Sequence, residues 1–132
     1  MIKGVGIDIV YIPEMIRLIN AMGASFVSHT FTQNEIEEAN NRINTFEYYS
    51  ERFAVKEALF KSISSIINDN FDLKKIETLN KANGQPYIHI TPYLKKFMLQ
   101  ANISNFHVSI SADKDYAIAY VIAEGDRPYE SI

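Results

Sequence analysis

Apolar and polar residues alternate along the beginning of the chain. Positions 5, 7 and 9 are apolar, and Gly4, Gly6 and Asp8 lie between them. This period of two predicts a β-strand with one small, polar face. Pro13 then indicates the start of a helix, because a proline at the first helical position loses no hydrogen bond. An apolar stripe continues this helix to Gly23.

Two further helices are predicted before the middle of the chain. Thr32 and Glu35 have the spacing of a capping box, in which each side chain bonds a free backbone amide, so a helix should begin here and run towards Arg42. The longest helix is predicted over 46–67, because aromatic residues recur there at spacings of three, four and seven. The polar run 68–70 should end it.

The pattern changes to strands after this helix. Segments 71–80 and 87–90 favour two strands around a turn at Asn83 and Gly84. Gly84 suits such a turn because glycine adopts a positive φ without strain. We therefore expect a hairpin in this part of the chain.

The last third of the chain completes the predicted fold. A short helix is expected over 92–101, and a closing hairpin joins the alternating segment 106–111 to the apolar segment 116–123. One strand, three helices, two strands, one helix and two strands predict an α+β fold, with an antiparallel sheet packed with a long helix and shorter helices. No linker or repeat divides the sequence, so we expect a single domain over 1–132.

The composition is that of an ordinary folded protein. The chain has 132 residues, of which 47% are hydrophobic and 22% charged, and this length supports one domain with its own core. It has no cysteine, which excludes disulfides, Cys-ligated zinc, iron–sulfur clusters and thiol catalysis. A formal net charge of −3 and a pI near 5.6 argue against broad electrostatic binding of nucleic acid.

The sequence also lacks the patterns typical of membrane insertion or export. No stretch approaches the ~20 apolar residues of a membrane span. Lys3 and Asp8 interrupt the apolar start before it could form the core of a signal peptide. We therefore expect a cytoplasmic protein that does not associate with membranes.

Glu57 is the carboxylate that fits its predicted surroundings least. Helical spacing places it about 20° from Phe46 and about 40° from Phe53 around the helix axis, within the apolar stripe. A charged group on a buried face loses hydration and is normally retained only when it is paired or binds a metal. Two interpretations remain open: an ion pair with Lys61, one helical turn later, or a functional site.

Asp8 is a second candidate for chemistry. It shares a strand face with Gly4 and Gly6, which would leave room for a ligand close to the backbone. The alternative is that Asp8 only caps a turn or a helix. Two carboxylates together with Lys61 meet the needs of Mg²⁺-assisted phosphoryl chemistry, because hard oxygens hold the metal and an ammonium group neutralises phosphate charge.

Several segments carry a family resemblance. They are Gly6-Ile7-Asp8 near the N-terminus, RFAVKEALFK at 52–61, NGQPY at 83–87, and FHVSIS at 106–111 before DYA at 115–117. In this order, over nearly the whole chain, they resemble the holo-acyl-carrier-protein synthase family, the small trimeric class of 4′-phosphopantetheinyl transferases. The pairing of G-x-D with K-E-A-x-x-K is more specific than either motif alone.

The resemblance implies a reaction and a site. The phosphopantetheine arm of coenzyme A would be transferred to a serine of an apo acyl carrier protein, releasing adenosine 3′,5′-bisphosphate. Asp8 and Glu57 would bind Mg²⁺, Glu57 would assist deprotonation of the serine, and Lys61 would contact the coenzyme A diphosphate. The family also implies a homotrimer, with sites between protomers and the two carboxylates meeting across an interface.

Three more residues are candidate coenzyme A contacts. Gly84 and Pro86 lie in the segment that resembles the family's nucleotide-side turn, and the alternative is a simple hairpin turn. Ser109 shares a strand face with His107 and Ser111, which is either a row facing the ligand or an ordinary polar outer face.

The chain departs from the family pattern at three places. Segment 62–70 has no glycine where family members usually have a glycine-rich turn, so a longer helix could reshape the coenzyme A cleft. Ala112 replaces a histidine or an equivalent polar residue. Glu14 replaces a basic residue at the place where the acidic carrier docks, although Arg17, Lys3 and Lys56 could form a basic patch.

These departures keep other functions open. The first alternative is a non-catalytic paralogue that binds a carrier protein or a nucleotide. The second is a different Mg²⁺-dependent enzyme that handles phosphate with the same pair of acids. The third is a structural interaction domain without a ligand, for which Asp8 and Glu57 would be dispensable.

Overall fold

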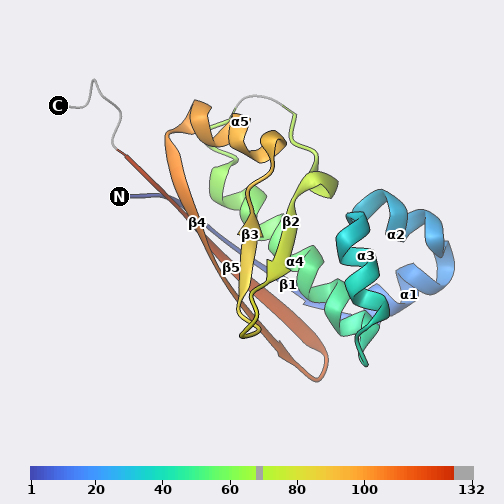
Figure 1. Cartoon of the computed structure of the whole chain (residues 1–132). Helices are drawn as coiled ribbons and strands as arrows, with labels where there is room; N and C mark the ends of the chain where they lie inside the picture. The colour runs from blue at the N-terminus through green and yellow to red at the C-terminus, as the bar shows by residue number, and fades with distance from the viewer. Residues whose placement is uncertain (68–69, 127–132) are drawn as a thin grey trace.

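Three antiparallel strands form the larger of two sheets. The computed structural model describes residues 1–67 and 70–126. In spatial order the strands are β1 (Ile2–Tyr11), β5 (Tyr116–Gly125) and β4 (Ile103–Asp113). Figure 1 shows these three as the longest strands of the molecule. The predicted closing hairpin is β4–β5, and the predicted α+β fold with an antiparallel sheet is confirmed.

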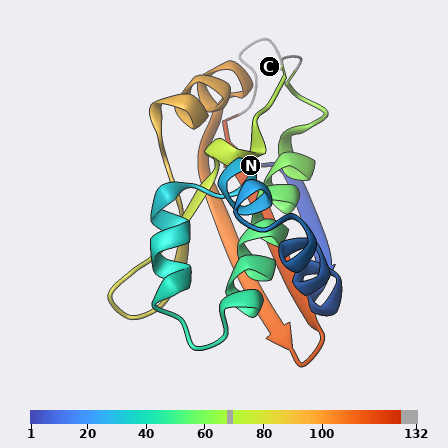
Figure 2. The ribbon, with the colours of Figure 1, turned by 90° about the vertical axis from the view of Figure 1, so that its right-hand side faces the viewer.

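One long helix packs along this sheet and shorter helices surround it. Figure 2 shows α4 (Thr45–Ile63) lying along the larger sheet, beside α1 (Ile12–Met22) and α3 (Gln33–Asn40). The remaining elements are α2 (Ala24–Thr30), a 3₁₀ turn η1 (Leu73–Lys75), the hairpin of β2 (Glu77–Asn80) and β3 (Pro86–His89), and α5 (Pro92–Ala101). The hairpin forms the second sheet, with two strands.

Two glycines let α4 approach β1. A Cβ atom at Gly4 would lie 1.8 Å from the carbonyl oxygen of Ser62, and one at Gly6 would lie 1.9 Å from that of Ala58. Any side chain at these positions would push the helix away from the strand. The expectation that Gly4 and Gly6 leave room for a ligand is therefore wrong, because the helix backbone occupies that room.

Most of the predicted elements are present, with three corrections. Helix α4 ends at Ile63 rather than Ile67, so residues 64–66 form a turn and do not extend the helix. The strand expected over 71–80 shrinks to β2, because Asp72 caps the 3₁₀ turn that precedes it. Helix α2 was missed. The predicted end of the long helix at 68–70 includes Asn68 and Asp69, which lie outside the described residues.

The buried face of α4 differs from the predicted aromatic stripe. Tyr49 is buried, but Phe46, Phe53 and Phe60 are only half-buried. The residues that pack in the core are mostly smaller: Ala54, Val55, Ala58, Leu59 and Ile63. The sequence overlooked this face because Lys56 and Arg52, both charged, are also buried on it. The expectation that Lys56 contributes to a surface basic patch is wrong.

The larger sheet is buried on one face and exposes apolar side chains on the other. The face towards α4 carries small residues on β5, and Ala117, Ala119 and Ala123 are fully buried. The opposite face is apolar and exposed: Val5, Ile7 and Ile9 are 51%, 56% and 58% exposed. On β5, Ile118 and Tyr120 lie beside Ile9 and Ile7 in the same exposed surface. We call the surface formed by these residues and Val5 the outer sheet face.

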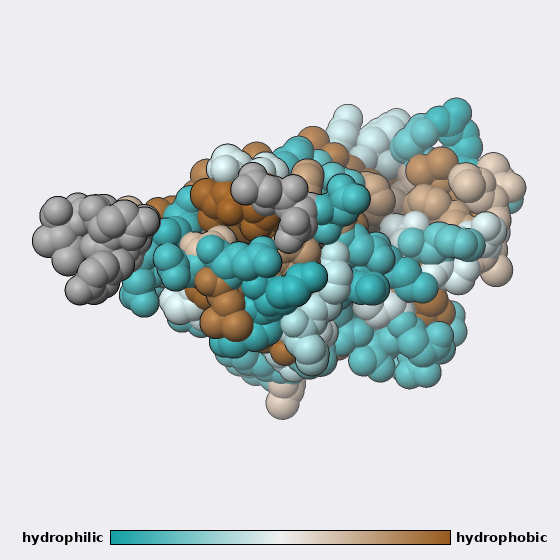
Figure 3. All heavy atoms as spheres, turned by 90° about the horizontal axis from the view of Figure 1, so that it is seen from above, coloured by the Kyte–Doolittle hydropathy of each residue, from teal (hydrophilic) through white to brown (hydrophobic). Residues whose placement is uncertain are grey.

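At the end of the molecule where α5 lies, the surface has the mixed polarity that is typical of proteins. Figure 3, viewed from that end, shows hydrophilic side chains over much of the surface, with hydrophobic side chains in separate patches. Within the described part of the chain, no helix combines the length and the apolar character that a membrane crossing requires.

Candidate functional site

Strand β1 and helix α4 bring three of the predicted site residues together. Asp8 points to the α4 side of the sheet, where Lys61 Nζ donates hydrogen bonds to Asp8 Oδ1 at 3.1 Å and to the carbonyl oxygen of Ile7 at 3.1 Å. Glu57 lies one helical turn before Lys61 and lines the same pocket as Asp8. This contact depends on the close approach of α4 to β1 that Gly4 and Gly6 allow.

The two carboxylates repel each other across this site. Desolvation raises the pKa of Glu57 above its ordinary value, the negative charge of Asp8 raises it further, and Lys61 partly opposes both. Asp8 and Lys61 are not sealed from solvent, since their side chains are 17% and 50% exposed. A perturbed carboxyl group in an accessible pocket is a typical feature of functional sites.

An apolar hollow of about 280 Å³ adjoins the carboxylates. Met15, Leu18 and Phe53 line its apolar side, and Asp8 and Glu57 line the other. Glu14 also lines it from α1, where it pairs with Arg17. The departure at Glu14 thus places a third acidic side chain beside the pocket.

Two expectations about these residues need correction. Lys61 pairs with Asp8 across the strand–helix contact, and not with Glu57 on its own helix. Asp8 and Glu57 also lie together within a single chain, whereas the family resemblance implied that they meet across an interface. Both corrections have the same cause, since the glycine face of β1 brings Asp8 directly against α4.

The donor atoms at this site fit a hard cation. Asp8 and Glu57 offer carboxylate oxygens, which Mg²⁺ prefers, and a bound cation would relieve their mutual repulsion. Among residues 1–67 and 70–126, no group of three or more His, Asp or Glu side chains is placed to hold a metal. Two protein carboxylates would leave the other positions of a magnesium octahedron to substrate oxygens and water.

The other predicted contacts lie elsewhere in the chain. Gly84 lines a hollow of about 650 Å³ between α3 and the β2–β3 hairpin. Pro86 lines a smaller hollow of about 180 Å³ beside β4. Ser109 is exposed on β4, next to Tyr120 of the outer sheet face. None of these three residues lines the hollow that holds Asp8 and Glu57.

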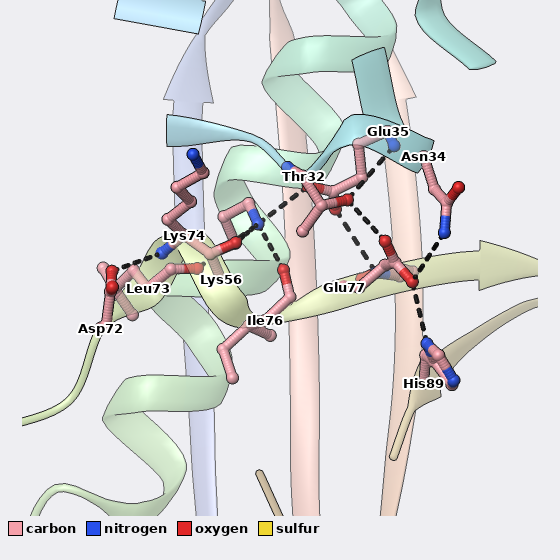
Figure 4. Close-up of polar contacts among 11 residues, drawn as sticks. Thr32, Asn34, Glu35, Lys56, Asp72, Leu73, Lys74, Ile76, Glu77 and His89 are labelled. Atoms are coloured by element: carbon pink, nitrogen blue, oxygen red, sulfur yellow. Dashed lines mark hydrogen bonds and ion pairs between the residues drawn. The ribbon is translucent and has the colours of Figure 1, made fainter. Parts of the chain in front are cut away.

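A second charged group on α4 was missed by the sequence analysis. Lys56 is buried, and its Nζ lies 2.8 Å from Glu35 Oε1 and within hydrogen-bond distance of the carbonyl oxygens of Leu73, Lys74 and Ile76. Figure 4 shows this ammonium group enclosed between α3, α4 and the start of β2. Burial lowers the pKa of Lys56, and the charge of Glu35 opposes that shift.

Glu77 extends this network to the hairpin. It accepts hydrogen bonds from Thr32 Oγ1 at 2.6 Å and Asn34 Nδ2 at 3.4 Å, and His89 Nδ1 lies 2.8 Å from its Oε1 (Figure 4). Burial alone would raise the pKa of Glu77, but these hydrogen bonds together lower it. The capping box of Thr32 and Glu35 was the only signal of this network in the sequence.

Among the described residues, the remaining departures do not line the hollow of Asp8 and Glu57. Ala112 is half-buried on β4, opposite Ala117. In segment 62–67, Ser62 Oγ donates to the carbonyl oxygen of Leu59 at 2.6 Å, and Ile67 is buried. The rest of that segment includes Asn68 and Asp69, outside the described residues.

Comparisons with known proteins agree on one family. Residues 4–121 match the model of the 4′-phosphopantetheinyl transferase superfamily. The chain is 38% identical over 125 residues to the holo-[acyl-carrier-protein] synthase of Wolbachia sp. subsp. Drosophila simulans (strain wRi), with 92% of this chain and 98% of the relative covered.

Solved structures give the same result. The crystal structure of holo-[acyl-carrier-protein] synthase from Neisseria meningitidis matches with a TM-score of 0.87 and 32% identity, covering 94% of this chain and 99% of that one. The structure of holo-(acyl-carrier-protein) synthase from Bacillus anthracis in complex with CoA (3′,5′-ADP) matches with a TM-score of 0.77 and 27% identity, covering 96% and 99%.

Proposed function

The chain belongs to the holo-[acyl-carrier-protein] synthase family of 4′-phosphopantetheinyl transferases, and we propose that Asp8, Glu57 and Lys61 carry out its reaction. This reaction transfers the 4′-phosphopantetheine group of coenzyme A to a serine of an apo acyl carrier protein. The observation that supports these roles is that both carboxylates line one accessible pocket and that Lys61 bonds Asp8 beside it.

The proposed chemistry is a phosphoryl transfer. The serine oxygen forms a bond to the phosphorus that carries pantetheine, the bond from that phosphorus to the bridging oxygen breaks, and adenosine 3′,5′-bisphosphate leaves. Glu57 accepts the serine proton, because a carboxyl group with a raised pKa is a stronger base than an ordinary one. Lys61 stabilises the charge that develops on the leaving oxygen.

Asp8 and Glu57 are the proposed Mg²⁺ ligands. When bound, the ion would neutralise charge on the diphosphate and lower the barrier to nucleophilic attack. Asp8 also holds Lys61 through the 3.1 Å hydrogen bond, which keeps the ammonium group next to the carboxylates. The pocket therefore provides both anionic ligands for a cation and a cation for the phosphate.

We also propose a homotrimer with sites between protomers. The outer sheet face exposes a continuous set of apolar side chains, which is typical of a surface that contacts another protein. Gly84 and Pro86 are separated from the Asp8 pocket within one chain. A second copy of the chain would cover the apolar face and supply the turn that contacts the nucleotide.

The substrates also suggest where the protein acts. We propose that it acts in the cytoplasm, where it would meet coenzyme A and the apo carrier protein. The non-catalytic alternative is less well supported, because none of the three departures removes Asp8, Glu57 or Lys61.

Intact-mass spectrometry tests the proposed function. An apo acyl carrier protein is incubated with the protein, coenzyme A and Mg²⁺, beside a control with EDTA. The expected result is the gain of one phosphopantetheinyl group only when the metal is present. Tight carrier binding without a mass gain would instead favour the non-catalytic paralogue, and nucleotide hydrolysis without a carrier would favour a different phosphate-handling enzyme.

A further inference from the structure

Asn80 connects the β2–β3 turn to two arginines. Its Nδ2 donates a hydrogen bond to the carbonyl oxygen of Gly84 at 2.9 Å. Its Oδ1 accepts from Nη2 of Arg52 and, at 3.4 Å, from Nη2 of Arg42. One amide side chain therefore joins the turn to α4 and to the segment after α3.

Both arginines of this connection lie against the same tyrosine ring. Arg52 is only 2% exposed, and its guanidinium carbon lies 4.5 Å from the centre of the Tyr48 ring. Arg42 lies 5.0 Å from the centre of the same ring, and its 40% exposed side chain also pairs with Glu38. The acceptor oxygen of Asn80 thus meets two guanidinium groups that lie over one aromatic side chain, of which that of Arg52 is buried.

The turn itself has little other support. Its internal hydrogen bonds join Lys81 to Gln85, Gly84 to Lys81, and the amide of Gln85 to Oδ1 of Asn83, and the residues from Lys81 to Gln85 are all exposed. Gly84 has a φ of +90°, which only glycine adopts easily. The bond from Asn80 is the one side-chain link in the described structure that holds Gly84 from outside the turn.

We infer that Asn80 is a positioning residue for coenzyme A: it fixes the turn that contains Gly84 by anchoring it to Arg52 and Arg42. This inference rests on the proposed function, in which the turn contacts the nucleotide. Asn80 does not touch the reacting atoms, because it lines a different hollow from Asp8 and Glu57, and Lys61 bonds Asp8. Its loss should weaken nucleotide binding while the chemical step stays unchanged.

Asn80→Asp separates positioning from folding. The carboxylate retains an acceptor for both arginines, so the variant should fold, but it loses the amide that donates to Gly84. Ala82→Asp is the matched control, because it adds the same charge to the exposed turn and leaves the Asn80 bonds intact. Calorimetric titration with adenosine 3′,5′-bisphosphate and steady-state transfer assays are then compared for the two variants and the unmodified protein.

The expected result for Asn80→Asp is a rise of about tenfold in the Kd of adenosine 3′,5′-bisphosphate and in the KM of coenzyme A, with kcat within about twofold and an unchanged melting temperature. A tenfold change corresponds to about 1.4 kcal/mol, the size of one hydrogen bond. For Ala82→Asp, we expect less than about a threefold change in Kd.

Two results would overturn the inference. An unchanged Kd for Asn80→Asp, in an otherwise active protein, would show that the turn needs no anchor. Equal rises in Kd for Asn80→Asp and Ala82→Asp would show that the added negative charge, and not the position of the turn, weakens nucleotide binding. If the unmodified protein neither binds the nucleotide nor transfers phosphopantetheine, the proposed function fails, and this inference fails with it.

Discussion

Neighbouring residues of α4 place similar charged groups in opposite environments. Lys56 and Glu35 form a pair whose side chains are 1% and 0% exposed, and the ammonium group of Lys56 also lies within hydrogen-bond distance of three carbonyl oxygens. One residue later, Glu57 shares a pocket open to solvent with Asp8, which pairs with Lys61. The same residue types thus build a closed network on one side of the helix and an open site on the other.

The two environments indicate which charged groups stabilise the fold and which are available for chemistry. In the buried network, opposite charges and hydrogen bonds compensate for the loss of hydration. At the open site, desolvation raises the pKa of Glu57, the nearby charge of Asp8 raises it further, and Lys61 compensates for these effects only in part. Partly compensated charge in an accessible pocket is available to bind a cation and a substrate.

Removing the buried lysine should produce the largest effect. Lys56→Ala leaves Glu35 buried without its partner, and breaking a buried ion pair in this way costs about 3–5 kcal/mol of unfolding free energy. Urea unfolding measures the loss. Lys95→Ala, which removes an exposed lysine of α5, should change the unfolding free energy by less than about 0.5 kcal/mol. Equal effects of the two substitutions would contradict the structural role of Lys56.

Weakening the open site should reduce activity without a comparable loss of stability. Asp8→Asn keeps an oxygen near Lys61 but removes a negative charge, so Mg²⁺ binds less tightly. We expect transfer to slow about 100-fold at low Mg²⁺, with partial recovery at high Mg²⁺ or with Mn²⁺. Transfer rates across a Mg²⁺ titration test this. A rate independent of both the substitution and the metal would show that Asp8 is no ligand.

A charge at the rim of the pocket should have a smaller effect. Glu14 lies beside the carboxylates, where it would repel an acidic carrier protein. Glu14→Gln should lower the KM for such a carrier about threefold at low salt, and the gain should shrink at high salt because surface charges are screened. A KM that rises on substitution would mean that Glu14 contacts the carrier directly.

The smallest expected effect is a gain in stability at the open site. Because the pKa of Glu57 is raised in the folded protein, its charged form is disfavoured there, and stability falls as pH rises through that pKa. Glu57→Gln should therefore stabilise the fold by about 0.5 kcal/mol at pH 7. The gain should vanish below the ordinary pKa of a glutamate, where Glu57 is protonated in both states. Thermal unfolding at pH 7 and at a pH below the ordinary pKa of glutamate measures the difference. A loss of stability of Glu57→Gln at pH 7 would contradict the raised pKa of Glu57.

The sequence predicted the open site better than the closed network. Short motifs singled out Asp8, Glu57 and Lys61, which the structure brings together, and period-two alternation and capping signals identified most strands and helices. Glu57 was chosen partly for a wrong reason, because the aromatic stripe is not the buried face of α4. Lys56 and Glu35 were not paired, since 21 positions separate them in the chain and no local pattern shows that contact. The role of Gly4 and Gly6 also depends on a helix far away in sequence.

The transfer rate of Glu57→Gln tests the central claim most directly. Intact-mass spectrometry follows phosphopantetheine transfer to an apo carrier over time, with the unmodified protein and Lys95→Ala measured in parallel. If the open site performs the chemistry, Glu57→Gln is folded and at least about 1,000-fold slower, a loss of about 4 kcal/mol in transition-state stabilisation. A folded Glu57→Gln protein within about tenfold of the unmodified rate would contradict the claim.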